Sequence, residues 1–104
     1  MSQHRIVFVT CPPAAAEALA ERLLEQGLAA CVNCVPGLRS MYRWRGEIQH
    51  DDETLLLIKT DVAHVDALRE AVLAAHPHEL PEFVAVQIDD AHPPYLKWIS
   101  DSLA

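Results

Sequence analysis

The chain has 104 residues, a length that suits one domain with one hydrophobic core. Hydrophobic residues make up 51% of it and only three residues are glycine, which excludes a disordered or low-complexity chain. The net charge of −7 without a Lys/Arg cluster argues against nucleic acid as a partner, and no apolar run approaches the ~20 residues that span a bilayer. We therefore predict a single domain over residues 1–104 that binds neither nucleic acid nor membranes.

The N-terminal third predicts a strand and then a helix. Residues 5–10 are a β-branched and aromatic run, which is typical of a buried strand. Cys11, Pro12 and Pro13 end this strand, and prolines are tolerated where a helix begins. Apolar residues at helical spacing follow as far as Gly27, where we expect the helix to end.

The segment from residue 29 to residue 60 lacks a helical period and has repeated strand character. Pro36-Gly37 indicates a bend and Asp51-Asp52 indicates a turn. Residues 54–60 form a continuous apolar run, which is typical of a strand covered on both faces. We therefore expect long paired strands in this part of the chain.

An alternating pattern occupies residues 41–48 within that segment. A strand there would place Tyr42, Trp44 and Ile48 on one face and charged residues on the other. The aromatic side chains could stack on a nucleic-acid base, but aromatic residues flanked by arginine are more typical of a buried protein interface. We predict that Tyr42 and Trp44 are interface anchors.

The last 44 residues predict a helix, a strand and a short terminal helix. Asp61 can cap the second helix, whose apolar stripe runs from Val65 to Ala75 and which Pro77 ends. Residues 83–88 form a fourth strand, and residues 95–102 form a last short helix.

The resulting order is strand, helix, strand, strand, helix, strand, followed by the terminal helix. This order predicts an α+β fold, a ferredoxin-like βαββαβ sandwich with a long central hairpin and a C-terminal helix. Both main helices would cover one face of the sheet. An uncovered apolar face and a long aromatic hairpin are liabilities in a monomer, so we expect self-association.

Several linked motifs resemble those of the CutA-type divalent-cation tolerance proteins, in the same order over nearly the whole chain. The motifs are Thr10-Cys11-Pro12, Ala29-Ala30-Cys31-Val32-Asn33, Val35-Pro36-Gly37, Ser40-x-Tyr42-x-Trp44-x-Gly46-x-Ile48, Lys59-Thr60, His76-Pro77-x-Glu79-x-Pro81-Glu82 and Tyr95-Leu96-x-Trp98-Ile99. The resemblance implies a tight PII-like homotrimer in which long strands pair across subunits. It also implies a role in divalent-cation tolerance with copper as the metal, and it implies no catalytic reaction. His78 departs from the pattern, because the family often has tyrosine there.

Cys11, His76 and His78 are the candidate metal ligands. The two histidines flank a proline, so in an extended stretch both rings would leave the same side. Imidazole with nearby carboxylates or with a Cys11 thiolate suits copper or zinc. The alternative is a histidine that only complements the dipole at a helix C-terminus.

Lys59, Glu79 and Glu82 are the candidate contacts of a cleft ligand. At the end of its strand, Lys59 could meet either glutamate across a subunit boundary, as a structural ion pair or as part of an anion pocket. Cys31 and Cys34 invite a redox or zinc interpretation, but residues three apart on a strand point to opposite faces, so we expect structural thiols.

The sequence therefore predicts a homotrimeric divalent-cation tolerance protein that binds copper or another divalent cation and needs no obligatory cofactor. The alternative is a PII-like sensor or scaffold that binds a small anion or a partner protein in clefts between subunits. A mainly structural assembly is the third possibility. No catalytic constellation is present, so we expect no enzyme. Three cysteines, an odd number, and the lack of a signal-like N-terminus predict a cytoplasmic protein with reduced thiols.

Overall fold

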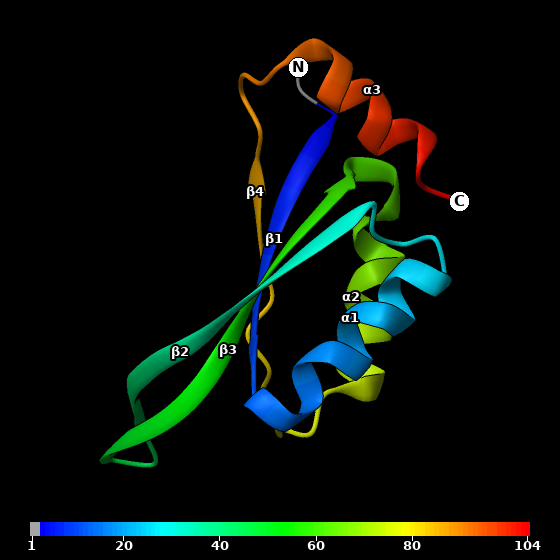
Figure 1. Cartoon of the computed structure of the whole chain (residues 1–104). Coiled ribbons are helices and arrows are strands. Elements are labelled where there is room, and N and C mark those ends of the chain that lie inside the picture. The colour runs from blue at the N-terminus through cyan, green and yellow to red at the C-terminus, as the bar shows by residue number, and fades with distance from the viewer. Residues whose placement is uncertain (1–2) are drawn as a thin grey trace.

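The computed structural model describes residues 3–104 and contains one antiparallel sheet. Its strands have the order β2-β3-β1-β4. They are β1 (His4–Cys11), β2 (Cys31–Trp44), β3 (Glu47–Asp61) and β4 (Val84–Gln87). This order, with the helices between the strands, confirms the predicted α+β ferredoxin-like fold (Figure 1).

Two helices cover one face of this sheet and a third lies at its end (Figure 1). They are α1 (Ala16–Glu25), α2 (Val65–Ala75) and α3 (Pro93–Asp101). Short 3-10 turns lead into the first two, Pro13–Ala15 before α1 and Val62–His64 before α2. Asp61 accepts a hydrogen bond from the backbone N–H of His64, as its predicted capping role requires. Within residues 3–104, no helix is long and apolar enough to cross a membrane.

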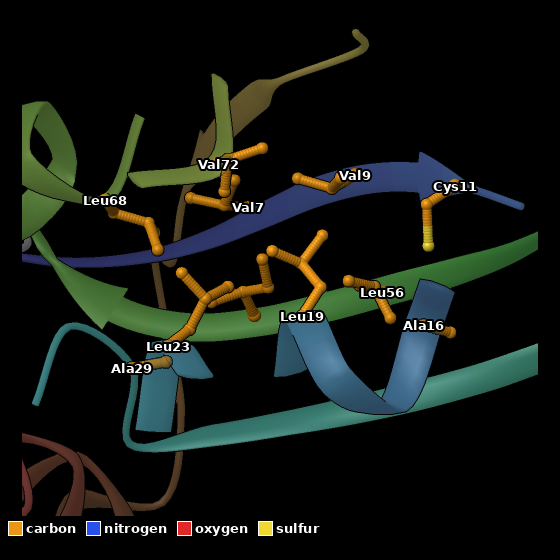
Figure 2. Packing of buried hydrophobic residues seen from close by; sticks show 11 residues of the cluster. Val7, Val9, Cys11, Ala16, Leu19, Leu23, Ala29, Leu56, Leu68 and Val72 are labelled. Carbon is orange, nitrogen blue, oxygen red and sulfur yellow. The ribbon is translucent and has the colours of Figure 1, made fainter. Parts of the chain in front are cut away.

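The hydrophobic core lies between the sheet and the two covering helices (Figure 2). Alternate residues of β1 and β3 point into it, because successive side chains of a strand leave opposite faces. The buried set is Val7, Val9, Cys11, Ala16, Leu19, Leu23, Ala29, Leu56, Ile58, Leu68 and Val72. The core therefore depends on the central strands and on one stripe of each covering helix.

The opposite face of the sheet, which we call the open face, is covered only in part. Ile6 and Phe8 of β1 are half-buried, as are Leu55 and Leu57 of β3. In β4, Val84 and Val86 are 50% and 40% exposed. Within the single chain, residues 54–60 are covered fully on one face only, so the predicted cover of the other face by self-association stays a prediction.

The β2–β3 hairpin turns later than predicted. Its turn lies at Arg45-Gly46, where both residues have positive φ (51° and 82°), as a tight two-residue hairpin requires. Asp51 and Asp52 lie inside β3, paired with β2, so the predicted turn there is wrong. The bend at Pro36-Gly37 is confirmed as a β-bulge, because the register of the pair shifts between Val35 and Leu38.

The turn also changes which side chains share a face at the tip. Trp44 pairs with Glu47, and Arg43 pairs with Ile48. Paired residues lie on the same face, so Ile48 lies opposite Trp44 and the prediction that they share a face is wrong. The two turn residues interrupt the alternation that the sequence pattern shows. Beyond the core, the hairpin extends the molecule to 44 × 26 × 23 Å (Figure 1).

Candidate functional site

A cavity of about 590 Å³ lies between the β2–β3 hairpin and the connection from α2 to β4. We call it the hairpin pocket. Its lining combines aromatic residues of the hairpin with acidic and imidazole groups of the connection. The lining residues are Thr10, Ser40, Met41, Tyr42, Trp44, Glu53, Pro77, His78, Glu79, Leu80 and Glu82.

The strand register explains why the hairpin contributes these side chains. In β3, Glu53 shares its side with Leu55 and Leu57, so it belongs to the open face. Tyr42 and Trp44 of β2 lie on that same side through their pairing with β3. One face of a continuous ribbon therefore supplies both the carboxylate and the aromatic wall of the hairpin pocket.

His76 ties the connection to the end of β1. The ring is buried, with 7% of the residue exposed. Its Nε2 donates to the carbonyl oxygen of Thr10 at 2.7 Å, and its Nδ1 accepts from the backbone N–H of His78 at 3.1 Å. Since both ring nitrogens are engaged, His76 could ligate a metal only after it gave up one of these bonds.

Cys11 lies on the core face of β1, beside the buried side chains of α1 (Figure 2). Its Sγ lies 3.9 Å from the carbonyl oxygen of Thr54. Burial raises the pKa of this thiol, and the charges of Cys34 and Glu53 raise it further. A thiol held in its neutral form is a weak metal ligand.

The predicted ligands do not form a complete metal site within one chain. Of the three, only His78 lines the hairpin pocket, where its ring lies against that of His76 with centroids 4.8 Å apart. Within residues 3–104, no group of three His, Cys, Asp or Glu side chains is arranged to hold a metal ion. Metal ligation by Cys11, His76 and His78 therefore stays a prediction.

The three carboxylates of the hairpin pocket have different surroundings. Glu79 forms an ion pair with Arg45 of the hairpin turn at 3.2 Å, and both side chains are largely exposed. Glu82 has a raised pKa, first because burial desolvates it and then because Glu53 repels its charge. Glu53 is buried, with only 6% exposed. The pocket therefore holds one sheltered carboxylate, Glu53, beside two that belong to exposed residues, Glu79 and Glu82.

The aromatic residues of the hairpin also have polar partners. The hydroxyl of Tyr42 donates to Asp51, and this bond is the main reason for the raised pKa of Tyr42. The guanidinium of Arg45 lies over the Trp44 ring, 5.4 Å from its centroid. Their role as interface anchors stays a prediction.

Lys59 lies far along β3 from the hairpin pocket. It pairs with Ile6 and Cys31, and its amino group donates to Asn33. The predicted contact with Glu79 or Glu82 therefore does not occur within one chain, and contact across a subunit boundary stays a prediction. The lining residues of the pocket include neither lysine nor arginine.

Cys31 and Cys34 lie on opposite faces of β2, as their spacing predicts. They pair with Lys59 and Leu56, whose side chains leave β3 on different sides. Both are free thiols, as is Cys11.

Glu53 is the site residue that the sequence patterns did not single out. Its alternation with Leu55 and Leu57 was a usable signal, because it places the carboxylate on the open face. Interpreting Asp51-Asp52 as a turn hid this signal, since a turn would have separated Glu53 from the hairpin.

The fold places the chain with ferredoxin-like proteins whose solved relatives include a PII-like one. The solved structure of "PII-like protein CutA" from Nostoc sp. PCC 7120 has a TM-score of 0.91 at 30% identity, over 96% of this chain and 97% of that one. The profile of the family "CutA1 divalent ion tolerance protein" matches residues 5–102. The chain belongs to this family.

Individual relatives agree with this assignment. The chain is 45% identical to "Divalent-cation tolerance protein CutA" of Thermus thermophilus, covering 95% of this chain and 97% of that protein. It is also 45% identical to "Protein CutA homolog" of Xenopus laevis, over 90% of this chain but only 63% of the relative. The crystal structure of CutA from Xylella fastidiosa has a TM-score of 0.96 at 42% identity, over 99% of this chain and 100% of that one. The chain thus spans the bacterial relatives and about three fifths of the frog protein.

Proposed function

We propose that the chain acts as a homotrimer in divalent-cation response and binds copper or another divalent cation. Family membership supports the role in cation tolerance. The observation that carries metal binding is the lining of the hairpin pocket, which places His78 beside carboxylates and includes no lysine or arginine. Imidazole and carboxylate together suit divalent ions such as Cu(II) and Zn(II).

His78 is the ligand that this chain offers most directly. It is exposed, and Glu79 and Glu82 of the same connection line the pocket with it. His76 fixes the connection through both ring nitrogens, so its role is to position His78. Because three ligands do not converge within the described part of the chain, a neighbouring subunit would complete the site.

The open face supports the trimer. Ile6 and Phe8 are only half-buried, and Val84 and Val86 of the edge strand are exposed. Covering these side chains by copies of the chain would remove apolar surface from water, and Tyr42 and Trp44 would add aromatic anchors at the hairpin.

The role that we propose is not enzymatic and lies in the cytoplasm. The relatives are named as tolerance proteins rather than as enzymes. The three free thiols fit a reducing compartment. Chloroplastic and periplasmic relatives carry those locations in their names, so location varies within the family.

A copper titration of the metal-free, reduced protein against a competing chelator tests the metal proposal. His78→Ala should weaken binding at least about tenfold at an unchanged melting temperature, because an exposed ligand is lost. His50→Ala is the matched control, since His50 is also exposed but lies on the other face of the hairpin from Tyr42 and Trp44. Equal affinities of the His78→Ala variant and the unchanged protein would rule out the proposed ligand.

A PII-like sensor that binds a small molecule is the second candidate function. The hairpin pocket favours it, because about 590 Å³ is far more than one metal ion fills and lies within the usual range of ligand sites. A thermal-shift screen of metal-free protein against cationic, anionic and neutral metabolites tests it. If no compound of any class raises the melting temperature, this candidate fails.

A further inference from the structure

We propose that the hairpin pocket takes a cationic nitrogen group, an ammonium or a guanidinium, with Glu53 as its counter-ion and Trp44 as part of its wall. This proposal rests on the second candidate function and specifies the chemistry of what the pocket binds. It adds a site residue, Glu53, and a ligand class that differs from the divalent metal assigned to the rim at His78.

The burial of Glu53 is the first observation that carries the proposal. Only 6% of the residue is exposed, and its side chain lines the pocket. Among residues 3–104, its side chain has neither a hydrogen bond nor an ion pair, and its carboxylate oxygens stay accessible from the pocket. A carboxylate in so sheltered a place is stabilised by a partner of opposite charge. An incoming donor with a positive charge would supply the missing partner.

The charge balance of the pocket is the second observation. Arg45 neutralises Glu79 at the rim, while Glu53 and Glu82 have no basic partner among the described residues. Both carboxylates line the pocket, and the charge of Glu53 adds to the rise in the pKa of Glu82 that burial causes first. Two unneutralised carboxylates attract a cation and repel an anion.

The aromatic wall favours an organic cation over a bare metal ion at this place. Trp44 and Tyr42 line the pocket beside Glu53. Aromatic faces attract ammonium and guanidinium groups, whereas a divalent metal requires several converging ligand atoms. No such set converges among residues 3–104. At the hairpin turn, the Arg45 guanidinium shows this chemistry, since it lies over the Trp44 ring and forms an ion pair with Glu79.

Such a nitrogen cation can come from two sources, a free small amine or a Lys or Arg side chain of a second copy of the chain. Both present the same chemistry to Glu53. Agmatine and putrescine serve as free probes, since one carries a guanidinium and both carry an ammonium. Neutral 1,4-butanediol has the same four-carbon spacing as putrescine without its charge and is the control ligand.

The test combines calorimetric titration of the metal-free protein with light scattering of its assembly state. With a free amine as occupant, agmatine or putrescine binds and butanediol does not. Glu53→Gln should then weaken binding at least about tenfold, because a charged hydrogen bond is lost. Glu47→Gln is the matched control, since Glu47 lies on the same face of β3 but is exposed at the tip.

With a second copy as the source, the amines do not bind, and Glu53→Gln shifts the assembly toward monomer while Glu47→Gln does not. Either result supports the proposal.

The proposal is overturned if Glu53→Gln changes neither amine binding nor assembly, or if its main effect is the loss of copper binding. Binding of anionic or neutral compounds alone would overturn it but keep the second candidate function. If no cationic, anionic or neutral compound binds and Glu53→Gln leaves the assembly unchanged, both this proposal and the second candidate function fail.

Discussion

The two halves of β3 show how differently one strand can be used. In the body of the molecule, Leu56 and Ile58 are fully buried against β1 and the covering helices. In the hairpin, Ile48 is 66% exposed, and Met41 of the neighbouring strand is 65% exposed. The strand is continuous and is paired with β2 on both sides of the bulge at Pro36-Gly37, so the difference comes from what packs on the ribbon and not from the strand itself.

This difference separates stability from recognition. The body holds the apolar cluster, and burial of such side chains supplies most of the free energy of folding. The hairpin contributes little to that cluster but supplies Tyr42, Trp44 and Glu53 to the pocket. Substitutions in the body should therefore change the free energy of unfolding, and substitutions in the hairpin should change association and binding.

The largest expected effect is that of Leu56→Ala in the body. Deleting a fully buried leucine side chain leaves a cavity and should lower the free energy of unfolding by about 2–5 kcal/mol. Ile48→Ala in the hairpin is the control and should cost less than about 1 kcal/mol, since the side chain is mostly exposed. Urea unfolding of both variants measures the difference. Equal losses would break the division between body and hairpin.

Trp44→Ala should act mainly on association. Loss of an aromatic anchor typically costs about 2 kcal/mol or more of interface free energy, so the variant should dissociate at a higher protein concentration. Light scattering over a dilution series measures this shift, with Trp98→Ala as the comparison because Trp98 lies in α3, away from the hairpin. An unchanged dilution profile for Trp44→Ala would remove the hairpin from the interface.

Gly27→Ala tests the packing between the end of α1 and the C-terminus of the chain rather than the hydrophobic core. Gly27 follows α1 with a φ of 69°, and a Cβ there would overlap Ala104. The left-handed backbone alone should cost about 1–2 kcal/mol, and displacement of the C-terminal residues adds to this. The melting temperature measures the effect. Gly37→Ala is the comparison, because Gly37 also has positive φ (80°) but has nothing within 4 Å of an added Cβ.

His64 should make a smaller contribution that depends on pH. Its Nδ1 bonds to Asp61 at 2.5 Å and its Nε2 to the carbonyl oxygen of Ala104 at 2.8 Å, and these bonds raise its pKa above the usual value. A raised pKa in the folded state stabilises the protein fully below the unfolded pKa of about 6.5, and this stabilisation is lost as the pH rises through the folded pKa. His64→Gln should therefore lower the melting temperature relative to the unchanged protein, and the decrease should be larger at about pH 5.5 than at about pH 8.5. A pH-independent difference would contradict the assignment.

The smallest expected effect is that of Lys97→Ala on the surface of α3. Lys97 and Asp101 form an exposed ion pair, and such pairs contribute about 0.5 kcal/mol or less. Urea unfolding should show a change within that range, and added salt should not enlarge it. A loss of unfolding free energy above about 1 kcal/mol would contradict the assignment of Lys97 and Asp101 as an ordinary exposed ion pair.

How far prediction succeeded depended on whether a local pattern carried the information. The helical stripes of α1 and α2 and the strand character of β1 follow from apolar spacing, and the structure confirms them except at Ala75, which is exposed at the end of α2. The hairpin turn was misplaced because Asp51-Asp52 is a commoner turn signal than Arg45-Gly46. Once the turn was misplaced, the face of Ile48 was also wrong, since a two-residue turn resets the alternation.

The candidate site could be predicted only in part. That His78, Glu79 and Glu82 share one site was visible because these residues lie close together in the chain. The engagement of both nitrogens of His76 was not visible, because one partner is the carbonyl oxygen of Thr10, 66 residues away. Glu53 likewise became a site residue only when the hairpin and the α2–β4 connection met around it.

The sequence by itself determined the order of elements, the apolar stripes that make the core and the family to which the chain belongs. These are local properties, because periodicity and motif spacing are written along the chain. Only the tertiary structure decided which charges lie together, which histidine nitrogens are engaged and which carboxylate lines the pocket without a partner. Those properties depend on side chains brought close from distant segments, and desolvation and pairing exist only after that approach.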